Sequence, residues 1–308
     1  MKKAAEDGDA SSGRATRGSV RSWGKLTVQL GCAIVLVFGG GTSRLQANPP
    51  PPSNRTLNLN YVYAADLGFG GYSIGGLTTA VYELPLEHTV QDFPNDALTL
   101  RIMAPIQVGF YSVNVTDTNG QRFSEDLQSL AFVPGVELQI PLGSRTVLKP
   151  FGQFGAGHLF GGDGGSSRNA YIYLGGARAA SQWSVGSSAV SLGEAVIYAG
   201  DSPIGSGFSE HYVSLQIGTE VRHGLGVTIR DITPDLGLYA IYYHYPSPLV
   251  FNRFLASDLE IRNQGEIGVS IGSASAFRLL GLSNPRIGAG FIYGGGLNVW
   301  HISFGFPF

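Results

Sequence analysis

The sequence predicts an all-β fold, a transmembrane antiparallel β-barrel of about 12 strands. Apolar and polar residues alternate with a period of two along many segments, as in strands with two different faces. Charged residues make up only 14% of the chain, against about 25% in typical soluble domains. The sequence also ends on WHISFGFPF, in which large apolar side chains occupy every second position. Together these observations favour a chain that meets lipid on one face of its strands.

Residues 1–47 have the pattern of a secretory signal peptide. A basic run from Arg14 to Lys25 leads into the apolar stretch LTVQLGCAIVLVF, and Leu45-Gln46-Ala47 resembles a cleavage site. That stretch is shorter than the roughly 20 residues of a membrane-spanning helix, so a single-span anchor is the less favoured alternative. Cys32 is the only cysteine, so we expect the exported chain to contain no disulfide.

The remaining chain is predicted to be one domain behind a short linker. NPPPPSN begins an extended linker over residues 48–56, and no Pro/Ser-rich break, charge block or repeat divides residues 57–308. Without residues 1–47 the chain carries 13 basic and 19 acidic residues, a net charge of −6. No basic patch with interleaved aromatic residues is present, so we expect no nucleic-acid partner.

Alternation is clearest in three segments. In LEIRNQGEIGVSIG, residues 259–272, the apolar side chains have one parity and the polar side chains the other: Leu259, Ile261, Ile267, Val269 and Ile271 against Glu260, Arg262, Gln264, Glu266 and Ser270. HYVSLQIGTEVR (211–222) and VELQIPL (136–142) repeat this design. A helical period fits none of them, so each predicts a strand with one apolar face.

Counting such segments between Gly, Asn, Asp and Pro breaks gives twelve predicted strands. They cover residues 57–65, 72–84, 97–112, 129–142, 146–158, 169–179, 188–200, 209–222, 234–246, 259–272, 285–294 and 297–308. Segments 66–84 and 223–246 can each be divided differently.

A soluble sandwich or propeller and a transmembrane barrel both accept this many alternating strands. A soluble sheet presents abundant Lys and Glu on its outer face, whereas Lys149 is the only lysine after residue 47. Strands of about 9 to 14 residues exceed the usual five or six of soluble sheets and match a tilted membrane crossing. The membrane barrel is therefore favoured, and a secreted soluble β protein is the remaining alternative.

The last predicted strand carries its apolar side chains on one side. The residues of this parity are predicted to face lipid: Trp300, Ile302, Phe304, Phe306 and Phe308. The strand resembles the final strand of bacterial outer-membrane β-barrels, which ends in an aromatic residue that the barrel-assembly machinery recognises. The resemblance implies localisation in a bacterial outer membrane after signal-peptide-dependent export, with outer-membrane lipid, lipopolysaccharide and the assembly machinery as partners. We expect a monomer.

A narrower resemblance rests on three stretches. PGVELQIPLGSRTVLKPFGQFGAG (134–157), VYELPL (81–86) and GLNVWHISFGFPF (296–308) are similar to segments of autotransporter translocator barrels. Because no long passenger segment precedes residue 57, the chain resembles the solitary outer-membrane autotransporter-like β-barrel family. The resemblance covers residues 57–308 and implies a twelve-stranded barrel. It supplies no catalytic motif, and no cofactor or metal is expected.

Eight charged residues have the inward parity: Arg101, Glu137, Arg178, Glu220, Arg222, Glu260, Arg262 and Glu266. An unpaired charge on the lipid face is costly, so these side chains are predicted to form a paired network in the lumen. The network would either line a selective constriction for a small solute or brace a plugged barrel, and we favour the second reading. The predicted function is a structural or passive pore, translocator-like, with a narrow lumen.

An outer-membrane lipid hydrolase is the main alternative function. Barrel lipases use a His and a Ser two residues apart on the lipid-facing side of one strand, and His301-x-Ser303 has that spacing. Both residues have inward parity, where a lipid ester cannot easily arrive. We therefore predict that the protein is not an enzyme.

Overall fold

The structure is a computed structural model, and it describes part of the chain: residues 63, 69–74, 77–92, 98–116, 122–161, 168–205, 209–228, 232–251, 259–273, 278–279, 282–283, 286–304 and 306–308. The chain divides into two units, Met1–Ser53 and Asn54–Phe308, and every described residue belongs to the second. The predicted signal peptide (1–47) and linker (48–56) lie outside the described residues.

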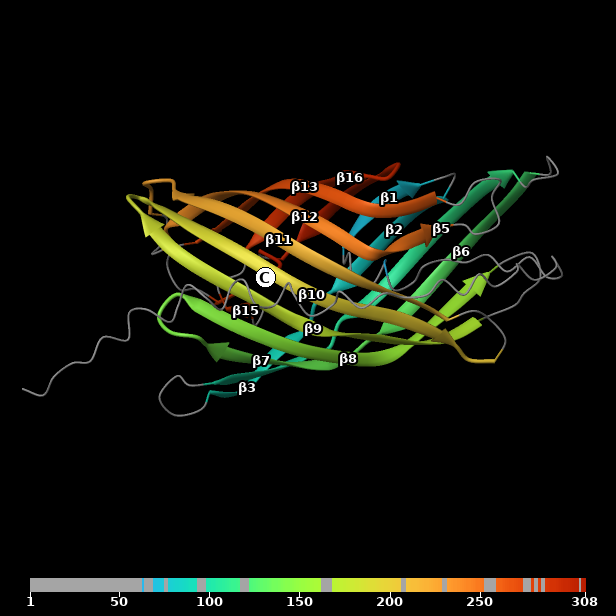
Figure 1. Cartoon of the computed structure of the whole chain (residues 1–308), viewed down its shortest axis with the longest axis horizontal. Coiled ribbons are helices and arrows are strands. Elements are labelled where there is room, and N and C mark those ends of the chain that lie inside the picture. Colours follow the sequence, from blue (N-terminus) through green and yellow to red (C-terminus); the bar gives the residue numbers. More distant parts are fainter. Residues whose placement is uncertain are drawn as a thin grey trace, which may run out of the picture. The chain divides into compact units, whose positions relative to one another are not determined.

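The second unit is built from β-strands that follow one another around a single sheet (Figure 1). Their bounds are β1 (Phe69–Ile74), β2 (Leu77–Leu84), β3 (Glu87–Asp92), β4 (Thr99–Met103), β5 (Ile106–Thr116), β6 (Arg122–Phe132), β7 (Gly135–Pro141), β8 (Thr146–Gly161), β9 (Arg168–Val185), β10 (Ser188–Pro203), β11 (Glu210–Gly224), β12 (Pro234–Phe251), β13 (Leu259–Ser273), β16 (Ile287–Gly294) and β17 (Leu297–Ser303). A separate two-stranded pair consists of β14 (Arg278–Leu279) and β15 (Leu282–Ser283).

Three pairs of these strands are continuous crossings interrupted by proline. The register of β2 with β5 continues into that of β3 with β4, and β6 and β7 continue one another along β8. The interruptions fall at Pro85, Pro105 and Pro134, and proline has no N–H to donate to the ladder. Bonds such as Ala104 N to Leu86 O, 2.7 Å, hold the crossings together at these points.

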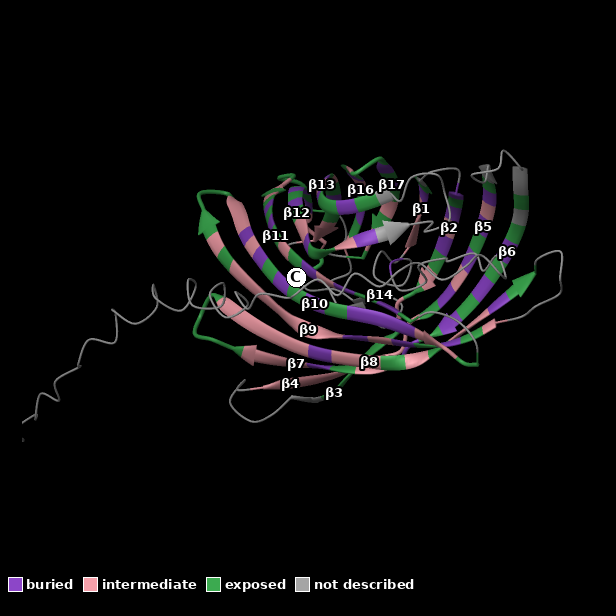
Figure 2. Cartoon of the chain, turned by 45° about the vertical axis from the view of Figure 1, so that its right-hand side comes forward, coloured by how far each residue is buried: buried purple, intermediate pink, exposed green. Residues whose placement is uncertain are grey.

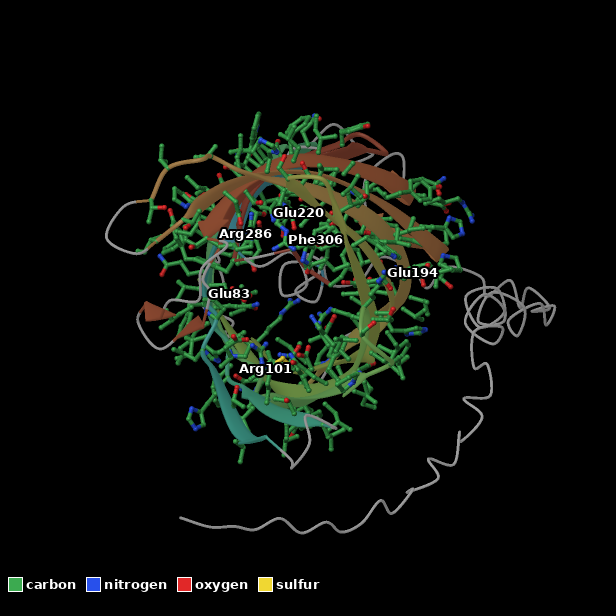
Figure 3. The ribbon with its side chains drawn as sticks, turned by 90° about the vertical axis from the view of Figure 1, so that its left-hand side faces the viewer. Glu83, Arg101, Glu194, Glu220, Arg286 and Phe306 are labelled. Carbon is green, nitrogen blue, oxygen red and sulfur yellow. The ribbon has the colours of Figure 1, made fainter. Side chains whose placement is uncertain are left out.

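The described strands therefore make twelve crossings that close into an antiparallel barrel. Each crossing pairs with the next along the chain, and β1 pairs with β17 from Phe69↔Ile302 to Ser73↔Asn298. Seen end on, the strands form a ring (Figure 3). Closure pairs the first and last strands with each other, so neither keeps the unpaired edge that it would have in an open sheet. The predicted fold and strand count are confirmed.

The first two crossings differ from the prediction. The only described residue of the predicted strand 57–65 is Tyr63, which is helical and 1% exposed. The predicted strand 72–84 is instead a hairpin, because β1 and β2 pair with each other up to Ile74↔Leu77. Gly75-Gly76 separates them in the sequence, a dipeptide typical of two-residue hairpin connections.

Buried and exposed residues alternate along the strands, so the wall has two faces (Figure 2). The outer face is rich in exposed large apolar side chains, including Phe110, Val136, Ile217, Ile267 and Trp300. The inner face carries buried charged residues such as Glu137 and Glu220, but also apolar ones such as Tyr111, Ile172 and Val299. The interior is therefore a mixed core, less polar than the alternation alone predicts.

Candidate functional site: the charged lining of the lumen

A first group of charges surrounds Glu137 on β7. Glu137 is 6% exposed, and its carboxylate lies 3.9 Å from Nη1 of Arg101 and 3.6 Å from Nη1 of Arg178. Register explains the first contact, because Arg101 on β4 is the direct cross-strand partner of Glu137. Arg101 also lies 3.2 Å from Glu87 on β3. The side chains alternate in charge from Glu87 to Arg101 to Glu137, which compensates the burial of Glu137.

The same group extends to β8. The Arg178 guanidinium lies 4.0 Å from the centre of the Phe151 ring, a cation–π contact. Lys149 is the cross-strand partner of Arg178, and its Nζ donates a hydrogen bond to the main-chain oxygen of Phe308 at 2.8 Å. Three cations and two carboxylates thus line this side of the lumen.

A second group surrounds Glu220 on β11, which is 1% exposed. Its carboxylate lies 3.5 Å from Nε of Arg222 and 3.8 Å from Nε of Arg286, and it accepts a 2.7 Å hydrogen bond from Ser270. Arg286 in turn lies 2.6 Å from Asp235. Two arginines and two carboxylates balance in formal charge, as buried charges require.

A third group joins Glu266 on β13 to His301 on β17. His301 Nε2 lies 2.5 Å from Glu266 Oε1, and the Tyr243 hydroxyl donates to the other carboxylate oxygen. Gly290 of β16 stands between the two strands, and a Cβ there would lie 2.5 Å from the same Glu266 oxygen. The glycine therefore leaves the space in which the pair meets.

A cavity of about 190 Å³ opens beside the Glu137 group. Its polar lining comes from Glu83, Glu87, Gln107, Gln153 and Arg178. The Gln107 amide donates a 2.6 Å hydrogen bond to Glu83, which fixes one wall. The cavity is smaller than the roughly 300 to 1,000 Å³ of typical ligand pockets, so it has room for water or a very small solute.

Two predicted lumen charges lie elsewhere. Glu260 and Arg262 have side chains 52% and 55% exposed and pair with each other at 3.5 Å, while Ile261 between them is completely buried. The alternation slips along β13, because the register with β12 shifts between His244↔Asn263 and Leu249↔Ile261. The irregularity reverses the parity, so the predicted inward charges face outward and the predicted lipid-facing Ile261 faces inward.

The end of β17 also departs from its alternation. Trp300, Ile302 and Phe304 are 68%, 39% and 49% exposed, on the predicted outer face. Phe308 is instead 5% exposed, and Phe306 packs against the buried core. β17 ends at Ser303, so the last residues are no longer held by the sheet and lie inside the barrel, where Figure 3 labels Phe306.

The arrangement of His301 does not match a lipid-facing hydrolase. Its Nε2 is engaged by Glu266 on the inner face, and its neighbour Trp300 is the residue exposed outside. A lipid ester that approached the outer face would meet Trp300 rather than the imidazole.

The sequence prediction missed five charged members of the lining described above: Glu83, Glu87, Lys149, Asp235 and Arg286. Asp235 stands in PDLGLYAIYY, where both parities carry apolar side chains, so its face could not be assigned. Arg286 precedes β16 but lies within the predicted strand 285–294, at the parity opposite to Ile287, Phe291 and Tyr293, so it was detectable in principle. Lys149 was detectable in principle, because a lone lysine in a long strand must avoid the apolar face.

Among the described residues, no helix is long and apolar enough to cross a membrane. No group of three or more His, Cys, Asp or Glu side chains in that part of the chain is placed to hold a metal ion.

The fold of this closed twelve-stranded barrel is similar to that of solved autotransporter β-domains. The transport unit of the autotransporter AIDA-I from Escherichia coli is similar over 77% of this chain and 88% of that one, with a TM-score of 0.52 and 15% identity. The β-domain of the Bordetella autotransporter BrkA is similar over 76% and 93%, with a TM-score of 0.46 and 10% identity. No family model and no curated protein matches the sequence. The resemblance predicted from the sequence is thus confirmed at the level of the fold.

Proposed function

We propose that the protein is a bacterial outer-membrane β-barrel with a passive, translocator-like pore role and a narrow lumen lined by paired charges. The observation that carries this proposal is the contrast between the two faces of the wall. Large apolar side chains are exposed outside, and ion pairs are buried inside. A soluble protein rarely exposes apolar surface on this scale, whereas a barrel in lipid requires it.

The lining indicates a restricted passage. The Glu137 group and the Glu220 group each contain charges of both signs, so in the described part of the lining they form no single-sign ring of the kind that selects ions strongly. Tyr63 is buried on the inner wall, where its hydroxyl donates a 3.1 Å hydrogen bond to Gln264, and so takes up lumen space. Such an interior favours a rigid barrel with low conductance.

From the proposed outer-membrane location we also propose which partners the barrel meets. The outer face would contact outer-membrane lipid and lipopolysaccharide, and the barrel-assembly machinery would insert the chain after signal-peptide-dependent export. Trp300 and Ile302 of β17, and Phe304 directly after its end, remain exposed for recognition. We propose no nucleic-acid partner and a monomeric barrel.

The first test is the gel migration of the outer-membrane fraction, with unboiled and boiled samples compared in detergent. A closed barrel resists detergent until it is heated, so a heat-dependent shift in that fraction is expected. Recovery of the protein in the periplasm or the medium, with no shift, would contradict the proposal.

Conductance of the purified barrel in a planar bilayer tests the pore role. Glu137→Gln leaves Arg101 and Arg178 without their shared carboxylate, so we expect a shift toward anion preference. Glu260→Gln is the matched control, because its side chain is exposed outside and should leave conductance unchanged. Equal selectivity in both variants would place Glu137 outside the ion path.

A further inference from the structure

The last three residues, Phe306–Phe308, leave the wall of the barrel and enter its lumen. The final pairs of β17 are Ser303 with Gly288 on β16 and Ile302 with Phe69 on β1. Pro307 has no N–H and could not donate to either ladder. We name residues 306–308 the inward segment.

The Phe308 ring packs on a bare patch of wall made by two glycines. Gly193 on β10 and Gly218 on β11 are direct cross-strand partners, so their missing side chains leave one continuous flat surface. A Cβ on Gly218 would lie 2.7 Å from Cε2 of Phe308, and a Cβ on Gly193 would overlap the ring. The wall is therefore shaped to the ring, and we call this surface the glycine cradle.

Further contacts hold the inward segment on neighbouring strands. Lys149 on β8 donates its hydrogen bond to the Phe308 main-chain oxygen at 2.8 Å. The Phe306 ring lies 5.0 Å from the Phe308 ring and 6.5 Å from the ring of Tyr239 on β12. The contacts thus span β8 to β12, whereas the segment starts from β17, so it passes through the interior. Figure 3 shows Phe306 within the ring of strands.

The sequence also supports a second placement of the same residues. Phe306 and Phe308 continue the parity of Trp300, Ile302 and Phe304, so an extended β17 would place both rings on the lipid-facing side. Protein surrounds the rings in one placement and lipid in the other, so the hydrophobic gain is similar in both. The cradle and the Lys149 contact are what favour the inward placement.

We propose that the glycine cradle is an intramolecular binding site for an aromatic residue, and that the inward segment bound there is a removable stopper that limits entry of solutes into the lumen. The proposal rests on the pore role proposed above. The two placements exclude each other, so their relative populations set the access to the lumen. The occupant is Phe308 of the same chain.

Thiol labelling of the lumen tests the stopper. Gln153→Cys in a Cys32→Ser background puts one thiol beside the lumen cavity, and a bulky water-soluble maleimide reports its accessibility. Gly193→Leu fills the cradle and should displace Phe308. We expect the labelling rate of the introduced thiol to rise by about tenfold, which corresponds to a docking free energy of about 1.4 kcal/mol. Gly175→Leu is the control, because a Cβ there meets nothing closer than 3.6 Å.

A second variant protects the test against misfolding of Gly193→Leu. The double variant Phe306→Ser/Phe308→Ser leaves the wall intact and removes both rings, so the same acceleration is expected. Unchanged labelling rates in heat-shifting, folded barrels of both variants would overturn the proposal.

Crosslinking tests the docked position directly. A Cβ on Gly193 would lie 2.6 Å from Cβ of Phe308, closer than the roughly 3.5 to 4.5 Å of a relaxed disulfide but within reach after a small shift. Gly193→Cys/Phe308→Cys should therefore oxidise in the folded barrel, and Gly193→Cys/Phe304→Cys should not. Failure of the first pair to crosslink would contradict the inward placement.

Ion current separates this proposal from the pore role. Accelerated labelling with no current in the ring-free variant would support the stopper and contradict the pore. Current in every variant with no change in labelling would support the pore and contradict the stopper.

Discussion

Glu266 on β13 and His301 on β17 meet across the strand that separates them, with 2.5 Å between Oε1 and Nε2. Gly290 on β16 leaves room for this contact, because a Cβ there would lie 2.5 Å from the same carboxylate oxygen. Gly290→Ala should push the pair apart and destabilise the barrel by about 1 to 3 kcal/mol, as overpacking does. The midpoint of the unboiled-to-boiled gel shift in urea measures this. Gly175→Ala, at an open position, should keep the parental midpoint, and equal loss in both variants would argue against a specific role for Gly290.

The buried charge groups should be far more sensitive than the surface pair. Glu220→Ala leaves Arg222 and Arg286 without their shared carboxylate, and breaking a buried pair in this way typically costs about 3 to 5 kcal/mol. Glu260→Ala breaks the exposed pair with Arg262 and should cost at most about 1 kcal/mol. Urea unfolding of both variants distinguishes the two cases. Similar midpoints would mean that water reaches Glu220 freely.

The outer face should not tolerate a cation at mid-strand. Ile267 is 56% exposed on β13, on the face proposed to meet lipid. Ile267→Arg should destabilise the inserted barrel by about 2 to 4 kcal/mol and lower its yield in the outer membrane. Ile267→Leu is the conservative control. Normal assembly of the arginine variant would place this face in water.

One carboxylate already stands on the outer face. Glu194 on β10 is exposed, whereas its neighbours Gly193 and Ala195 lie on the inner face. Removing the charge with Glu194→Leu should stabilise the inserted barrel, by less than the about 2 to 4 kcal/mol that a mid-membrane cation costs. Glu260→Leu, near the end of β13 and paired with Arg262, should give no such gain. A loss of stability in Glu194→Leu would indicate a partner for this carboxylate in the membrane.

The sequence predicted the features that depend on regular alternation. The outward residues of β11, of β13 from Ile267 onward, and from Trp300 to Phe304 follow parity, because one register error would turn every side chain of a strand to the wrong face. The same reasoning placed Glu137, Glu220 and Glu266 inside. Each of these residues is paired directly with both neighbouring strands.

Predictions failed where the ladder is irregular or ends. Glu260 and Arg262 lie beyond the register shift between β12 and β13. The shift falls at Pro246-Ser247-Pro248 of β12, so the residues that mark it are on the neighbouring strand and not in the alternating segment itself. Phe306 and Phe308 keep the right parity but lie beyond the end of β17. Their position depends on Gly193, Gly218 and Lys149, which are distant in the sequence, so local alternation could not reveal it.

The pairing of Phe69 with Ile302 has a consequence for how the barrel is made. During synthesis β1 emerges first and its seam partner β17 emerges after all the other strands. Until then β1 keeps a row of unpaired backbone groups that any other extended chain could join. Closing the ring also confines the long intervening chain, which costs entropy and slows folding. The open edge therefore needs protection until β17 has been made, and the risk of misassembly lasts for that whole interval.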